Sequence, residues 1–451
     1  MKQTEKTVNQ ITEGIIWKQL LYFFFPILLG TFFQQLYNTA DAMVVGRFVG
    51  KEALACVGGS SSQIINLIVG FFVGLSSGAT VIIAQYYGAR DEKNLQDTLH
   101  TAIAFSIVGS FVISILGIVL SPIILRLMNT PEYLMADSLL YLRFYFGGII
   151  FIFIYNIGSG ILRAVGDSKN PLYFLIFSCS LNLLLDLLAV TVFSFGVAGI
   201  AGATVLAQLI SSVLCFLYLY RNFRFLIPSR RHFSYNKKLV SELVTTGFSM
   251  GLMNSIFSIG SVILQGSINT LGTSIIAAHT AARRIVMIGN MPLASIASAN
   301  ATFVSQNFGA GRMDRIRDGI RKSSILCLIW SALFLVMILT LAKPLVKALA
   351  GTDDPVIMSN ALMNLHINMI FFFPLGVLLT LRMTLQGINY KTIPLISSSM
   401  ELVIKILASF VFVPLWGYAG ASVAEPFSWL LCMLFLLFSY IRIMKKEKIY
   451  S

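Results

Sequence analysis

Long apolar segments with very few charged residues restrict what this chain can fold into. Only 12% of its 451 residues are charged and 57% are hydrophobic, and the mean hydropathy is +0.81. Because soluble domains carry about 25% charged residues, an ordinary soluble fold is excluded. A membrane-spanning helix needs about 20 apolar residues, and the sequence predicts twelve such helices. They occupy approximately residues 16–45, 53–85, 97–121, 138–162, 171–193, 198–220, 241–269, 275–304, 323–342, 357–381, 393–413 and 418–441.

The chain also contains an internal repeat. The shift that aligns Gln85-Tyr-Tyr-Gly-Ala with Gln306-Asn-Phe-Gly-Ala also aligns Gly196-Val-Ala-Gly with Gly417-Tyr-Ala-Gly. Because six helices is an even number, both halves insert in the same orientation, and a site is expected between or within them. We therefore predict an all-α integral membrane protein with twelve transmembrane helices in two pseudo-symmetric six-helix lobes. A repeat that is kept for packing alone is the alternative.

The basic residues predict how the chain is oriented. Most of its 33 Lys and Arg residues fall in loops that lie on the inner side if both termini are cytoplasmic, as the positive-inside rule requires. We expect a multi-pass protein of the cell (plasma) membrane. Its predicted parts are a cytoplasmic N-terminus (1–15), an N-lobe (16–221), a basic cytoplasmic linker (222–240), a C-lobe (241–442) and a cytoplasmic C-terminus (443–451).

The same reasoning limits the function classes. The net charge of +14 does not indicate a nucleic-acid partner, because basic loops set membrane orientation in such chains. All five cysteines lie in apolar segments and form no disulfide or metal motif. No arrangement of nucleophile, metal ligands or acid–base pair is present in the sequence. We therefore expect a transporter and not an enzyme, with no cofactor and no metal site.

Four polar residues of the first half are predicted to form one site. A carboxylate such as Asp41 in a membrane segment costs about 2.5–3.5 kcal/mol, so it marks an ion, proton or substrate pathway. Asp186 and Thr204 lie at similar depth before and after one outer loop, and Asn182 lies one turn deeper than Asp186 on the same helix face. These oxygen-bearing groups suit a proton or a sodium ion better than a soft metal. A satisfied buried aspartate near a helix end is the alternative for Asp41.

Further motifs accompany these residues, namely the segment Gln34–Gly50, Gln85-Tyr-Tyr-Gly-Ala and Leu162-Arg-Ala-Val-Gly-Asp-Ser-Lys-Asn-Pro. With them, residues 14–442 resemble the multidrug and toxic compound extrusion (MATE) transporters, DinF-like in the N-lobe site. That branch carries an aspartate on helix one, Asn-x-x-x-Asp on helix five and a threonine on helix six. The resemblance implies two six-helix lobes and export of amphipathic, often cationic compounds against entry of H⁺ or Na⁺. Carboxylates that other branches carry on helices seven and eight have no counterpart here.

Other residues of the first half are candidates for contact with substrate or for bending. Pro26 lies inside the first apolar segment, where a proline frees a backbone carbonyl, and either a hinge or a static kink follows. Polar side chains on segments one and four are candidate substrate-binding groups of the cavity wall, although interhelical hydrogen bonding would explain amides equally well. These candidates are Gln34, Tyr37, Asn38 and Asn156.

The repeat also yields a hypothesis for the second half. The shift that aligns the two Gln-containing motifs places Glu425 at the position of Thr204, and a slightly longer shift, which aligns Pro171 with Pro394, places Lys405 at the position of Asn182. Glu401 lies one turn from Lys405 on the same helix face. We predict a structural charge cluster in which a tethered ammonium pairs with Glu425, Glu401 or both. The alternative is that one of the two glutamates carries protons.

An ion-coupled multidrug antiporter is thus the leading prediction, with coupling in the N-lobe by H⁺ or Na⁺. A lipid-linked oligosaccharide flippase of the same superfamily is the alternative, although only Arg143 and the pair Arg283 and Arg284 could supply its cationic cavity. The repeat and the internal carboxylates disfavour a channel. The expected partners are small amphipathic molecules and the lipid bilayer, and we expect a monomer.

Overall fold

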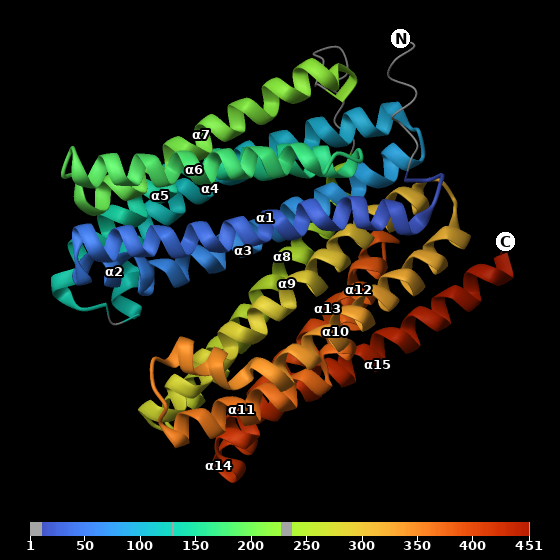
Figure 1. Ribbon diagram of the computed structural model, residues 1–451. Helices are drawn as coiled ribbons and strands as arrows, with labels where there is room; N and C mark the ends of the chain where they lie inside the picture. Colours follow the sequence, from blue (N-terminus) through green and yellow to red (C-terminus); the bar gives the residue numbers. More distant parts are fainter. Residues whose placement is uncertain (1–10, 129, 227–236, 451) are drawn as a thin grey trace. The chain divides into compact units, whose positions relative to one another are not determined.

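The computed structural model describes residues 11–128, 130–226 and 237–450, and these residues are helical apart from short connections (Figure 1). Contacts divide the chain into two compact units. The first unit contains Pro26–Gly251, and the second contains Leu252 onward together with the described residues before Pro26. Residues 1–10, 227–236 and 451, which fall in the predicted N-terminus, linker and C-terminus, lie outside the described residues.

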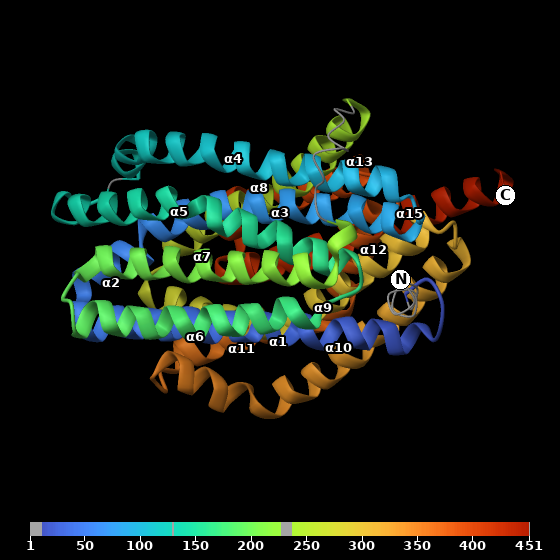
Figure 2. The ribbon, with the colours of Figure 1, turned by 90° about the horizontal axis from the view of Figure 1, so that it is seen from above.

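The first unit is built around one central helix. Its α5 contacts α3, α4 and α7, and α6 packs along α7 (Figure 2). The α5 side chains Leu142, Phe146 and Ile149 are fully buried there. The helices of this part of the chain are α1 (Ile16–Val44), α2 (Lys51–Gly58), α3 (Ser60–Gly88), α4 (Glu92–Leu127), α5 (Glu132–Ala164), α6 (Lys169–Thr191) and α7 (Gly196–Asn222).

The second unit repeats this plan. Its α11 and α12 meet at a bend of 52°, and α13 continues through a π-helical segment, η4 (Ala408–Phe412), into α14, much as α1 continues into the π-helical segment η1 (Val45–Val49) in the first half. The α-helices are α8 (Lys237–Asn269), α9 (Thr273–Gly309), α10 (Met313–Ala350), α11 (Pro355–Ile370), α12 (Phe372–Gly387), α13 (Thr392–Leu407), α14 (Val413–Trp416) and α15 (Tyr418–Tyr450).

Ten helical segments of the described residues are long and apolar enough to cross a membrane, and the bent pair α11–α12 makes an eleventh. The remaining long helix, α9, is more polar because its neighbours are protein. It packs against α10, α11 and α12, and its buried Asn300 donates a hydrogen bond to Thr384 Oγ1 over 2.9 Å. With α9 included, the described residues contain the twelve predicted spans, six in each half of the chain.

The backbone itself confirms the internal repeat. Residues with left-handed φ angles occur where a helix begins or just after one ends, at positions that glycine favours. Eight of these positions form four pairs, which are related by nearly the same shift as the sequence motifs. The pairs are Gly50 (φ 119°) with Gly272 (100°), Arg90 (57°) with Gly311 (70°), Gly166 (102°) with Asn389 (67°), and Gly196 (57°) with Gly417 (58°).

The two units do not coincide with the predicted lobes, because α1 and α8 each begin in one unit and end in the other. The segment before Pro26 belongs to the second unit, where Arg315 holds it. The Arg315 guanidinium donates to Gly14 O over 3.0 Å, to Ile11 O over 3.2 Å and to Gln19 Oε1 over 3.0 Å. One side chain of α10 therefore fixes the entry to α1.

The first part of α8 belongs to the first unit because small residues let it approach α3. On α3, Gly74 faces Gly251 of α8, and Gly78 faces Gly247 of α8. The two glycines of each helix are one turn apart. A Cβ atom at Gly74 would lie 2.6 Å from Gly251 Cα, and one at Gly78 would lie 2.6 Å from Gly247 Cα. Paired small residues of this kind permit close helix contact in membranes.

This contact predicts a difference between two glycines of one helix. Gly78→Ala should destabilise the protein by about 1–3 kcal/mol, because the added methyl group forces the two backbones apart. Gly70→Ala is the matched control, since a Cβ atom at Gly70 meets nothing within 4 Å. Thermal unfolding in detergent would measure both, and equal midpoints for the two variants would contradict the close packing of α3 on α8.

Candidate ion and substrate sites

The first unit brings together the four residues that the sequence predicts as an ion site. Asp41 lies near the end of α1, Asp186 and Asn182 lie on α6, and Thr204 lies on α7. Asp186 and Asn182 are 0% and 3% exposed. The carboxyl groups of Asp41 and Asp186 are hydrogen-bonded to each other, and Asn182 Nδ2 donates to Thr204 Oγ1 over 3.4 Å. The four residues that the sequence predicts as one site are thus linked in pairs, Asp41 with Asp186 and Asn182 with Thr204.

Two tyrosines join this cluster. Tyr37 of α1, which the sequence predicts as a wall residue, is hydrogen-bonded to Thr204 and lies within electrostatic range of both carboxyl groups. Tyr141 of α5 is buried and lies within the same range. Nothing in the sequence singles out Tyr141, because an aromatic residue in an apolar segment is indistinguishable from a packing residue.

The paired carboxyl groups define what this cluster can do chemically. A hydrogen bond between two carboxyl groups requires a proton on one of them. When that proton leaves, two carboxylates with nearby hydroxyl and amide oxygens remain, and such a set of hard ligands suits a small monovalent cation. The groups of this cluster are therefore those of a proton-binding or hard-cation-binding site, as the sequence predicts.

A cavity of about 150 Å³ in the first unit contains two of the predicted substrate-binding residues. Gln34 and Asn156 line it, together with Pro26 and the basic side chain of Arg163. Asn38 is not among its lining residues and is exposed. Pro26 lies within the continuous helix α1, at the residue where the chain passes from the second unit to the first.

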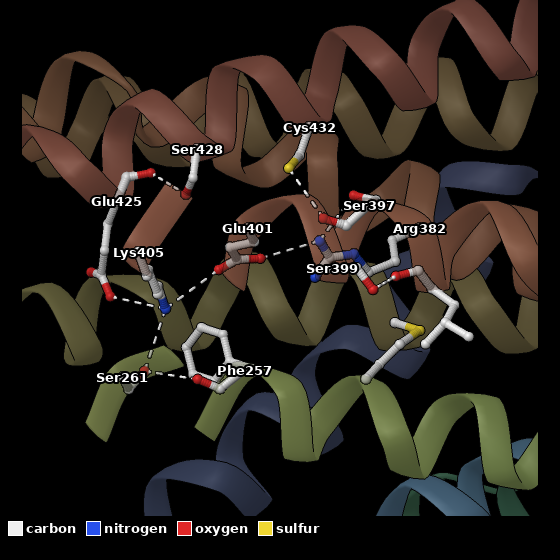
Figure 3. Close-up of polar contacts among 12 residues, drawn as sticks. Phe257, Ser261, Arg382, Ser397, Ser399, Glu401, Lys405, Glu425, Ser428 and Cys432 are labelled. Carbon is white, nitrogen blue, oxygen red and sulfur yellow. Dashed lines mark hydrogen bonds and ion pairs between the residues drawn. The ribbon is translucent and has the colours of Figure 1, made fainter. Parts of the chain in front are cut away.

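The second unit contains a network of buried charges that includes all three residues of the predicted cluster (Figure 3). Lys405 Nζ on α13 lies 3.3 Å from Glu425 Oε1 on α15 and 3.6 Å from Glu401 Oε1 one turn away. The ammonium is therefore paired with both glutamates. The Lys405 side chain is 1% exposed, whereas that of Glu425 is 23% exposed.

Arg382 extends this network and corrects an expectation from sequence. The predicted span 357–381 ends just before Arg382 and leaves it among the basic residues of an inner loop, but Arg382 lies within α12 and is only 8% exposed. Its Nη2 atom lies 3.3 Å from Glu401 Oε2 and 3.1 Å from Ser397 Oγ. The expectation is wrong because the helix continues beyond the predicted segment end at residue 381, so that the side chain turns toward α13.

Comparison with known proteins identifies the family. A model of the MatE family matches residues 26–188 and again residues 249–411, so it matches each half of the chain separately. The chain belongs to the MATE family. It is therefore a multi-pass membrane transporter of a family of multidrug efflux proteins, and not an enzyme.

Curated relatives in bacteria agree with this assignment. The chain is 30% identical over 313 residues to the probable multidrug resistance protein YoeA of Bacillus subtilis, with 68% of this chain and 67% of the relative covered. It is 24% identical over 418 residues to the probable multidrug resistance protein NorM of Thermotoga maritima, with 90% and 88% covered.

Solved structures confirm the predicted fold class. A MOP superfamily transporter from Pyrococcus furiosus superposes with a TM-score of 0.89 at 23% identity, with 97% of this chain and 98% of the other covered. A MATE crystal structure in the bent conformation gives a TM-score of 0.91 at 23% identity, with 98% of each chain covered. MATE transporters have twelve transmembrane helices in two lobes, as predicted here from the apolar segments and the repeat.

Proposed function

We propose that this MATE transporter is an antiporter that exports amphipathic, often cationic compounds in exchange for H⁺ or Na⁺. The hydrogen-bonded pair Asp41–Asp186 carries the proposal, because it supplies a buried group that can exchange a proton for a cation. Buried carboxylates in membrane proteins mark ion pathways by default. Names of relatives such as multidrug export protein MepA of Staphylococcus aureus support an exported drug as the substrate.

The proposed exchange follows from one site having two competing occupants. Two adjacent carboxylates repel each other, so the empty pair takes up a proton or a cation from the outer side. Uptake neutralises the negative charge that would hold a cationic substrate in the first unit. Substrate and coupling ion therefore exclude each other, which is the requirement for exchange.

Transport by purified protein in liposomes tests this function. A fluorescent organic cation should leave the lumen against its gradient when H⁺ or Na⁺ is made to flow the opposite way. The pH gradient and the sodium gradient are imposed separately. The gradient that drives uphill movement of the organic cation identifies the coupling ion. Transport that depends on neither gradient would contradict the proposal. The cytoplasmic placement of both termini is testable in the same liposomes by protease protection.

Pro26 is proposed as the hinge of α1. The helix is anchored in the second unit before this residue and packs in the first unit after it, and proline removes one backbone hydrogen bond at this point. Pro26→Ala should lower the turnover number several-fold and leave the affinity for substrate nearly unchanged. Pro122→Ala, inside α4, is the matched control. Unchanged turnover in Pro26→Ala would make Pro26 a static kink.

A further inference from the structure

We propose that the second unit contains a built site for an alkylammonium group, which the chain fills with its own Lys405. This inference goes beyond the proposed function, which places the coupling ion in the first unit. It concerns a second cation site, its ligand class and the reason that no external ion is needed there.

The Lys405 ammonium is surrounded by the kinds of groups that bind organic cations in proteins. Besides the two glutamates, Nζ lies 3.4 Å from Ser261 Oγ and 4.1 Å from the centre of the Phe257 ring. Both residues approach from α8 (Figure 3). Carboxylates combined with an aromatic face bind ammonium groups through ion pairing and cation–π attraction. The site thus offers each kind of contact that a primary alkylammonium requires.

The charges of the network require a cation at this point. Arg382 pairs with Glu401 through Oε2, and Lys405 contacts Glu401 through Oε1 and also Glu425. These ion pairs join two acidic and two basic groups, and Arg283 lies within electrostatic range of Glu425 as well. Without the Lys405 ammonium, the partly buried Glu425 would lose the one ion pair described for it, which is unfavourable. An emptied site would therefore favour a cation that also fits the contacts of the lost side chain, namely an alkylammonium ion.

The structure also leaves space for the aliphatic part of the Lys405 side chain. A Cβ atom at position 260 of α8 would lie 2.9 Å from Lys405 Cδ, so Gly260 leaves the room in which the stem lies. At the far end of the network, Glu425 keeps part of its side chain exposed. In a variant with a shortened lysine, an external cation would meet this partly exposed carboxylate first.

The repeat places this site at the position of polar candidates in the first half. The shift between the two family matches, which takes residue 26 to residue 249, relates the contacts from α8 and α13 to residues of α1 and α6. The slightly shorter shift that aligns the Gln-containing motifs relates Glu425 of α15 to Thr204 of α7. The pairs are Phe257 with Gln34, Ser261 with Asn38, Lys405 with Asn182, and Glu425 with Thr204. The first repeat is neutral at these positions, whereas the second supplies an aromatic face, a carboxylate and a permanent cation.

Chemical rescue tests the proposal. Lys405→Ala removes the atoms of one n-propylammonium ion, and we expect its unfolding midpoint to fall well below that of the wild type. Added n-propylammonium chloride should restore most of that loss and should saturate with concentration, as expected for a ligand that binds only the folded state. Neither n-propanol, which lacks the charge, nor sodium chloride should do so. Wild-type protein and Lys405→Met, whose sites are filled, should not respond.

A second substitution locates the rescue at this site. In Lys405→Ala combined with Glu425→Gln, the concentration of n-propylammonium for half-maximal rescue should rise at least about tenfold, because one carboxylate partner is lost. If Lys405→Ala is recovered only in unfolded form, the protein is extracted from membranes with and without n-propylammonium, and the folded fraction is compared. The same extraction is repeated for Lys405→Ser. Equal effects of ammonium and propanol, equal effects on all variants, or no recovery with ammonium for either shortened variant would overturn the proposal.

Discussion

Asp41→Asn should insert and fold normally but lose uphill export down to the level of empty liposomes. Asparagine keeps the size of the side chain, but it cannot give up a proton or carry the negative charge that a cation needs. Asp186→Asn should have the same effect, because the two carboxyl groups share one hydrogen bond. Export driven by separately imposed H⁺ and Na⁺ gradients in proteoliposomes measures the loss, and the amount of reconstituted protein is compared by gel.

Two controls make this result specific. Glu132→Gln changes an exposed acid in the first turn of α5 and should leave export unchanged. Downhill counterflow of substrate should persist in Asp41→Asn, because binding contacts outside the carboxyl pair remain. Gradient-driven export by well-folded Asp41→Asn and Asp186→Asn would remove these residues from the coupling site, whatever ion drives the wild type.

Lys405→Met should be strongly destabilising, and Glu425→Gln in the same chain should restore much of the loss. Breaking a buried ion pair by removing one partner costs about 3–5 kcal/mol, whereas replacing both partners by neutral groups is often tolerated. After loss of the Lys405 ammonium, Glu401 still has Arg382 over 3.3 Å, so Glu425 is the acid left without its partner in the network. Unfolding midpoints of the two single variants and the double variant form a complete cycle.

The second glutamate provides the matched control for this cycle. Lys405→Met combined with Glu401→Gln should not recover, because Arg382 then loses its buried acidic partner. Recovery with Glu425→Gln but not with Glu401→Gln would support a structural network with the observed connectivity. If the Lys405→Met and Glu425→Gln double variant folds but loses all coupled transport, these charges take part in the mechanism and the structural interpretation is wrong.

The sequence alone determined the fold class, the repeat and the depth of the polar residues. The twelve apolar segments determine the spans, because the bilayer core offers no hydrogen-bond partners to the backbone. An apolar segment of this length satisfies its own backbone groups by forming a helix. Position along a helix also gives depth, since every residue advances the chain by the same rise along the helix axis. This is why the sequence predicts Asp186 and Thr204 at similar depth, before and after one outer loop.

Only the tertiary structure decided which of these residues touch. The depth of a residue in the membrane does not show how its helix is rotated about its own axis or which helix lies beside it. Both depend on how the side chains pack. Tyr141 and Phe257 could not be recognised as members of the two sites, because each is one aromatic residue among many in apolar segments. Arg382 was missed because it follows the last apolar residue of its segment, and only the continued helix α12 turns it inward to Glu401. The passage of α1 and α8 from one unit to the other likewise depends on contacts between distant segments, such as those of Arg315 with the chain before α1, which no local pattern encodes.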